Sequence, residues 1–120
     1  MKSNLSFSDN VEFLDEARDE YDRLDGSVKI QVIKAINKIS ENPVVSTEGG
    51  LGKPLGNKGT TDLTGLGKIK LKKTGLRIVY KPIKKDNTGM VIIIIAARAD
   101  NEVYLEAQRR IEKLERTKYY

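Results

Sequence analysis

The chain has 120 residues and a net charge of +5, and it contains neither cysteine nor histidine. This length fits one compact domain that folds without disulfides. The composition excludes thiolate and imidazole metal ligands, and also the usual acid–base group of enzymes that work at neutral pH. No apolar run approaches the roughly 18 residues that cross a bilayer, and residues 1–4 open no signal-peptide pattern, so we expect a cytoplasmic protein.

Positive charge is concentrated in the C-terminal part of the chain. Residues 1–42 contain 6 Lys and Arg against 9 Asp and Glu, whereas residues 43–120 contain 16 against 8. A basic half of this kind is typical of nucleic-acid-binding proteins, although solvated lysines alone produce similar counts.

The N-terminal part is predicted to form a short strand and a helical hairpin. Residues 5–7 can form the strand, and apolar residues then recur at three- and four-residue spacing from Val11 until Gly26, which predicts an amphipathic helix. A second amphipathic helix is expected from Ser27 to Asn42, where the following proline stops it.

Four acids lie on the expected outer face of the first helix: Asp15, Glu16, Asp19 and Glu20. Carboxylates at helical spacing can in principle bind a divalent cation. No second acidic cluster completes an oxygen cage, so we interpret these acids as the solvated side of the helix and expect no metal.

Residues 43–67 are rich in glycine and predict a long loop. The segment 52–59 superficially resembles a phosphate-binding loop, but it lacks the Gly-Lys-Ser/Thr ending and no predicted strand precedes it. Lys53 and Lys58 within it remain candidate contacts to a nucleic-acid backbone.

Residues 68–80 alternate between basic and apolar side chains and predict a β-hairpin with its turn at residues 73–75. Alternation places the apolar residues on one face of the hairpin and the basic residues on the other. The basic face carries Lys68, Lys70, Lys72 and Arg77. Crowded like charges favour an anionic partner such as a nucleic acid, which Lys72 and the turn residue Lys73 would contact.

The apolar run Met90–Ala97 follows a polar turn at residues 81–89 and lacks alternation. It predicts a strand buried on both faces at the centre of the sheet, with Arg98 at its end.

A last amphipathic helix is expected from Asp100 or Asn101. Its predicted exterior is dominated by four cations, Arg109, Arg110, Lys113 and Arg116. The element order is then βααβββα in a single domain, residues 1–120. This is an α+β fold, with a small antiparallel sheet, a two-helix hairpin on one face and a C-terminal helix.

The chain resembles the RelE branch of the RelE/ParE toxins of bacterial toxin–antitoxin pairs. The family motif has two alternating lysines on a strand, an arginine in Gly-x-Arg-hydrophobic-Val-Tyr, an arginine that ends the last strand and a tyrosine six residues later. All five positions are filled, by Lys68, Lys70, Arg77, Arg98 and Tyr104. Two departures are Gly67, where a larger residue is ordinary, and the long loop at residues 43–67.

The resemblance implies a metal-independent endoribonuclease that needs no cofactor. It would cut mRNA in the ribosomal A site by attack of a 2′-hydroxyl and be neutralised by a cognate antitoxin, and it would reach operator DNA only through that antitoxin. Without histidine a lysine must serve as the base, and the hairpin offers several lysines crowded together for that role.

By resemblance, Lys70 is the general base and Lys68 shares or supports that role. Arg77 clamps the scissile phosphate, and Arg98 stabilises transition-state charge or assists the leaving group. Tyr104 stacks on a base or orients the 2′-hydroxyl, unless it is simply a half-buried core residue. Two other functions fit the composition: a ParE-like toxin that inhibits DNA gyrase without catalysis, and a basic nucleic-acid-binding module.

Overall fold

The computed structural model describes residues 6–41, 53–54, 57–58, 61–62, 65–83 and 89–118. Its elements are β1 (Val11–Phe13), α1 (Asp15–Asp22), α2 (Gly26–Ser40), β2 (Lys53–Pro54), β3 (Asn57–Lys58), β4 (Thr61–Asp62), β5 (Gly67–Leu71), β6 (Leu76–Ile83), β7 (Gly89–Ala96) and α3 (Asp100–Lys118). The predicted α+β class and the order βααβββα are confirmed for the longer elements. The predicted loop at residues 43–67 differs, because it contains three two-residue strands.

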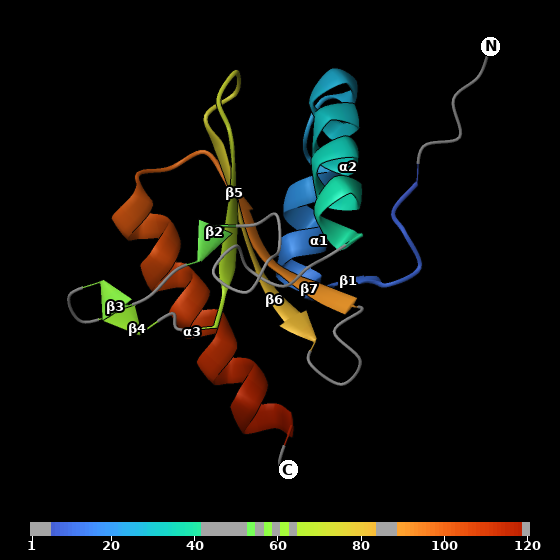
Figure 1. The fold of residues 1–120 in the computed structure, drawn as a ribbon. Coiled ribbons are helices and arrows are strands. Elements are labelled where there is room, and N and C mark those ends of the chain that lie inside the picture. The colour runs from blue at the N-terminus through green and yellow to red at the C-terminus, as the bar shows by residue number, and fades with distance from the viewer. Residues whose placement is uncertain are drawn as a thin grey trace.

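Five strands form the main sheet, in the order β1-β7-β6-β5-β2, while β3 and β4 pair separately. Helix α3 lies on one side of the main sheet, and α1 and α2 lie on the other (Figure 1). The neighbours β7, β6, β5 and β2 are antiparallel, but β1 runs parallel to β7. The sheet is therefore mixed rather than purely antiparallel as predicted.

The first strand lies at Val11–Phe13, not at residues 5–7, of which residue 5 is outside the described range. Val11 and Phe13 pack against the core, whereas Glu12 is exposed. This two-residue alternation fits a strand beside β7 and outweighs the helical spacing on which the prediction rested. Helix α1 consequently begins only at Asp15, after Leu14 in extended conformation.

Strand β7 is an inner strand buried on both faces, as predicted from its apolar run. Ile92 and Ile95 belong to a core beneath α1 and α2, which we call core 1. Ile93 and Ile94 belong to a second core beneath α3, which we call core 2. Two successive residues face α3 because Ile93 is an extra residue at a register shift against β6, as in a β-bulge.

Both faces of the hairpin sheet are therefore covered in part, which differs from the predicted division into one buried and one cationic face. Val79 lies opposite Lys68 in the β5–β6 register and is 0% exposed, because α3 packs over it in core 2. None of the described helices combines the length and apolarity that crossing a bilayer requires.

Gly67, which departs from the family pattern, has a steric reason in this chain. A Cβ atom at Gly67 would overlap Cζ of Tyr80 and lie 2.5 Å from its hydroxyl oxygen. Tyr80 is directly opposite on β6 and is 0% exposed. The tyrosine ring thus occupies the space that a side chain at residue 67 would fill.

We predict that Gly67→Ala destabilises the protein by about 1–3 kcal/mol, because Tyr80 must move within a packed core. The free energy of unfolding in urea measures this. Gly26→Ala is the matched control, since nothing lies within 4 Å of a Cβ atom at this first residue of α2. Equal effects of the two substitutions would contradict the explanation.

Candidate functional site

The β5–β6 hairpin brings the first two cations together. Lys70 and Arg77 are directly opposite each other in the register, so they share one face of the sheet as predicted. Leu71 pairs with Leu76, so the turn spans residues 72–75, and the Gly75 N–H donates to the Leu71 carbonyl at 2.8 Å. Gly75 takes a positive φ of 74° there, which glycine adopts without a steric penalty. Lys72 therefore lies in the turn and not on the strand.

Lys68 of β5 and Tyr104 of α3 contact each other. The Lys68 Nζ donates to the Tyr104 hydroxyl at 3.2 Å and lies 5.9 Å from the centroid of its ring. Tyr104 belongs to core 2 and is only 6% exposed. The core-packing alternative for Tyr104 therefore holds, and the buried ring has little surface left for stacking on a base. Its hydroxyl instead orients the lysine amine.

Arg77 and Arg98 are joined through the main chain. Arg77 Nη1 donates to the Arg98 carbonyl at 2.6 Å and to the Gly75 carbonyl at 3.2 Å. These bonds fix the hairpin turn against the end of β7. The Arg98 side chain is 47% exposed, and its Nη2 lies 4.0 Å from an oxygen of Glu20.

These contacts link the five motif residues in pairs, and we call the set the cationic site. Lys68 and Lys70 alternate along β5, Arg77 faces Lys70 from β6, Arg98 follows β7, and Tyr104 comes from the second turn of α3. Two sheet strands, the segment between β7 and α3, and α3 itself contribute to it.

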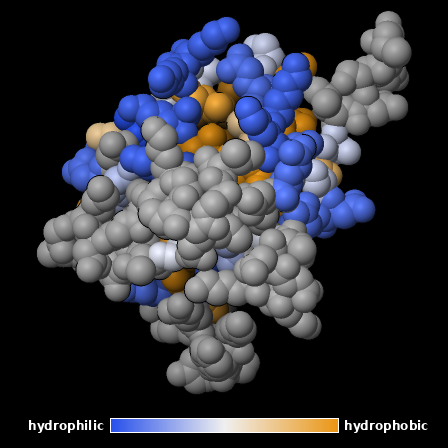
Figure 2. Space-filling model, viewed as in Figure 1, coloured by the Kyte–Doolittle hydropathy of each residue, from blue (hydrophilic) through white to orange (hydrophobic). Residues whose placement is uncertain are grey.

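The predicted RNA-binding lysines are placed only in part. Lys72 and Lys73 are exposed in the β5–β6 turn. Lys53 lies in β2 opposite Lys68, and Lys58 lies in β3, but their side chains are outside the described residues. Figure 2 shows hydrophilic surface over the upper part of this view, where the hairpin and α2 stand in Figure 1, with hydrophobic surface between.

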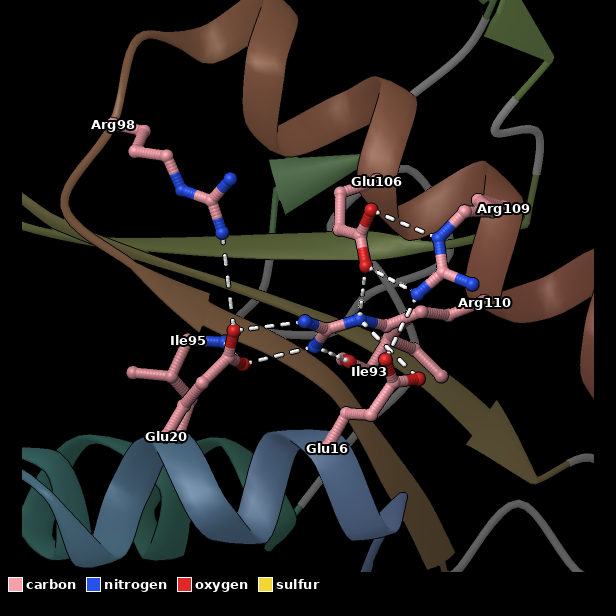
Figure 3. Close-up of polar contacts among 8 residues, drawn as sticks. All are labelled: Glu16, Glu20, Ile93, Ile95, Arg98, Glu106, Arg109 and Arg110. Carbon is pink, nitrogen blue, oxygen red and sulfur yellow. Dashed lines mark hydrogen bonds and ion pairs between the residues drawn. The ribbon is translucent and has the colours of Figure 1, made fainter.

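A buried ion-pair network lies behind the cationic site, and the sequence analysis missed it (Figure 3). Arg110 was predicted on the exterior of α3, but it is only 6% exposed. Its guanidinium donates to both oxygens of Glu20 at 2.9 and 2.8 Å, to Glu106 at 2.8 Å and to the Ile93 carbonyl at 2.9 Å. Glu20, predicted on the solvated side of α1, faces inward to meet it.

A spacing signal for this pair exists in the sequence. Arg110 lies three residues after Ala107, a buried residue of α3, and four residues before Leu114. Glu20 likewise lies three residues after the buried Ala17 and four before Leu24. A charge on each of two apolar stripes indicates a buried pair, because an unpaired charge there would cost several kcal/mol.

Acids elsewhere on α1 and α3 are also paired with cations. Arg109 bonds Glu106 at 2.6 Å and Glu16 at 2.8 Å. Among the described residues, no group of three or more acids is arranged to hold a metal ion. The hydrogen bond from Arg109, helped by Arg110 and opposed by burial, lowers the pKa of Glu106 to about 2.

This lowered pKa predicts a loss of stability in acid. The Glu106 carboxylate stabilises the folded chain above pH 4.5, its ordinary pKa, and this contribution is lost as the pH falls from 4.5 toward 2. Glu106→Gln should therefore flatten the decline of the unfolding midpoint over that range. Glu112→Gln, at an exposed acid of the same helix, is the control, and it should decline as the wild type does.

Comparison with known proteins identifies the fold. No protein-family model matches the sequence, and no curated protein sequence matches it either. Among solved structures, the isolated E. coli RelE toxin is 27% identical, covers 84% of this chain and 96% of its own, and has a TM-score of 0.58. A variant of E. coli RelE in the free state is 28% identical, covers 84% of this chain and 95% of its own, and has a TM-score of 0.61. A variant of E. coli RelE in complex with an antitoxin RelB peptide is 25% identical, covers 86% of this chain and 94% of its own, and has a TM-score of 0.57.

Proposed function

We propose, from the premise that this chain has the RelE toxin fold, that it is the toxin of a toxin–antitoxin pair. The similarity to E. coli RelE covers most of both chains and supports this class of protein. We further propose that the toxin is an endoribonuclease that acts in the cytoplasm and cuts mRNA in the ribosomal A site. The observation that carries this proposal is the cationic site, a set of four cations and a tyrosine from distant parts of the chain that are linked in pairs.

Cleavage of RNA at this site requires three tasks. A base must take the proton of a 2′-hydroxyl, donors must stabilise the charge that develops on phosphorus, and a proton must reach the leaving 5′-oxygen. The 2′-oxygen forms a bond to phosphorus as the bond to the 5′-oxygen breaks, which leaves a 2′,3′-cyclic phosphate and a free 5′-hydroxyl. We assign the first task to the amine of Lys70.

The arginines suit the second task. A guanidinium grips two phosphate oxygens at once, and Arg77 is oriented for this by the Arg98 and Gly75 carbonyls. Arg98 is half exposed and can turn to the same phosphate or to the leaving oxygen.

We assign supporting roles to Lys68 and Tyr104. The Tyr104 hydroxyl is 3.2 Å from the Lys68 amine and holds it beside the phosphate position. This makes Tyr104 a positioning residue for Lys68 rather than a stacking platform.

The remaining cations suit the approach to RNA. Lys72 and Lys73 are exposed in the turn next to Lys70 and Arg77, and α2 adds Lys34 and Lys38 on an exposed face. Each phosphate that such a cation neutralises adds salt-dependent affinity. We propose that these lysines contact mRNA and ribosomal RNA, and that Lys53 and Lys58 add to them.

The inhibitory partner is proposed to be a cognate antitoxin. E. coli RelE has been solved both with its antitoxin and with an antitoxin peptide. A segment of the antitoxin would cover apolar or cationic surface of this chain, and any contact to operator DNA would be made through the antitoxin.

We predict that Lys70→Ala and Arg77→Ala each abolish growth inhibition on induction. Both proteins should still fold, by circular dichroism, and still bind the antitoxin. Primer extension on a translated message should show cuts with the wild type and none with either variant. Arg23→Ala, with the same change of charge at an exposed residue after α1, should remain toxic. Full toxicity of either site variant would refute the assignment, and DNA-damage signalling without mRNA cuts would indicate gyrase inhibition instead.

We predict a smaller, graded effect for Tyr104→Phe. The ring stays packed in core 2, so the free energy of unfolding should change by no more than about 1 kcal/mol. Loss of the acceptor for Lys68 should lower the rate of cleavage by about 10- to 100-fold, as expected for one hydrogen bond to a charged group. Single-turnover cleavage of a ribosome-bound message measures this, and an unchanged rate would remove Tyr104 from the site.

A further inference from the structure

Glu20 connects three parts of the molecule that the cationic site needs (Figure 3). Its carboxylate, on α1, accepts two hydrogen bonds from Arg110 of α3 and one from the Ile95 N–H of β7 at 3.0 Å. The same carboxylate faces the Arg98 guanidinium, with 4.0 Å between the closest atoms. Among the hydrogen bonds and ion pairs of the described residues, Glu20 is the acid that meets the end of β7.

The contact with β7 replaces a missing strand. Strand β1 ends at Phe13, opposite Ile92, so within the described part of the chain β7 has no strand partner on this side beyond that point. Instead, the Ile95 N–H donates a hydrogen bond to the Glu20 carboxylate, and the Ile93 carbonyl accepts one from Arg110. Buried backbone groups left without partners are costly, so this ion pair fixes the last residues of β7 in place.

Arg98 of the cationic site lies three residues after Ile95, the residue that Glu20 holds. Arg98 follows the fixed end of β7, and its carbonyl holds Arg77 Nη1 at 2.6 Å. A displacement of Arg98 would therefore move Arg77 as well. A misplacement of about 1 Å is enough to lower an enzymatic rate about 100-fold.

The negative charge of Glu20 attracts Arg98 without forming a direct hydrogen bond to it. Three hydrogen bonds already satisfy the carboxylate, and 4.0 Å is too long for a direct hydrogen bond to Arg98. The remaining attraction is Coulombic and acts on a half-exposed side chain. A phosphate can therefore draw Arg98 away, while Arg98 without a substrate stays close to its working position.

We propose that Glu20, held by Arg110, is a positioning residue that places Arg98 and, through the Arg98 carbonyl, Arg77 for RNA cleavage. This inference rests on the proposed function. Glu20 touches no substrate in it, and its effect must pass through the two arginines.

The test is a double-mutant cycle with Glu20→Gln and Arg98→Ala, measured by single-turnover cleavage of a ribosome-bound message. Glu20→Gln should lower kcat about tenfold or more with little change in KM, because it disturbs geometry and not affinity. On the Arg98→Ala background the same substitution should have an effect at least about threefold smaller. Arg98→Ala keeps the carbonyl that holds Arg77, so an equal factor in both backgrounds would mean that Glu20 does not place the Arg98 side chain and would overturn the proposal.

Arg109→Gln is the matched control. Arg109 is the neighbour of Arg110 and also joins α3 to α1, through Glu16, but neither β7 nor Arg98 is among its contacts in Figure 3. Its substitution should change cleavage less than about twofold, the range of a surface ion pair. Glu20→Gln leaves Arg110 buried with a weaker partner, so the variant Glu20→Gln/Arg110→Met covers the case of misfolding. It keeps an acceptor for Ile95, removes both buried charges and should show the same loss of kcat.

An NMR measurement separates this proposal from the proposed function. The backbone amide of Arg98 and the guanidinium signals of Arg77 should shift in Glu20→Gln and stay in place in Arg109→Gln, whether or not the protein cleaves RNA. Unchanged signals in Glu20→Gln would overturn the positioning role. A wild-type protein that shifts as expected but cuts no message would instead overturn the proposed function.

Discussion

The architecture depends on one constraint, which is the burial of β7 on both faces. A run of β-branched residues with no polar alternation must be covered from both sides, because each isoleucine left in water costs about 2 kcal/mol. Helices α1 and α2 cover one side, and α3 covers the other. Once both faces are occupied, cations of the sheet can remain accessible only where the helices end. The cationic site lies at such a margin, at the C-terminal end of β7 and the N-terminal end of α3.

This arrangement makes Tyr104 part of the core and part of the site at once. Its ring packs with Val103 and Ala107 in core 2, while its hydroxyl meets Lys68. The packing of α3 on the sheet is thereby coupled to the position of Lys68 on β5. The ring serves the packing and the hydroxyl serves the proposed chemistry, so one side chain has both roles.

Local patterns predicted much of the fold and of the site. The alternation of basic and apolar residues in the hairpin placed Lys70 and Arg77 on one face, and the apolar run identified β7 as an inner strand. Both depend on neighbours in sequence and on simple strand geometry. The resemblance to RelE supplied the residues that no local pattern connects, Arg98 and Tyr104.

Features set by distant partners could not be predicted in this way. Val11–Phe13 became a strand because β7 offered a free edge, although its spacing also fits a helix. Glu20 and Arg110 were assigned to solvated faces because each was considered as a single charge on its own helix, whereas the two form an ion pair between α1 and α3. Gly67 looked like a departure from the family until Tyr80 was found in the space of its missing side chain.

The acceptors that hold the cationic site have a consequence for its electrostatic potential. Lys68 donates to a neutral hydroxyl, and Arg77 Nη1 donates to two backbone carbonyls. In the network behind the site, by contrast, Arg109 and Arg110 are bonded to carboxylates. Neutral acceptors fix the direction of a cation without cancelling its charge. The Lys68 amine is therefore oriented before any polyanion arrives, and the hydroxyl that holds it leaves its positive charge available to attract one.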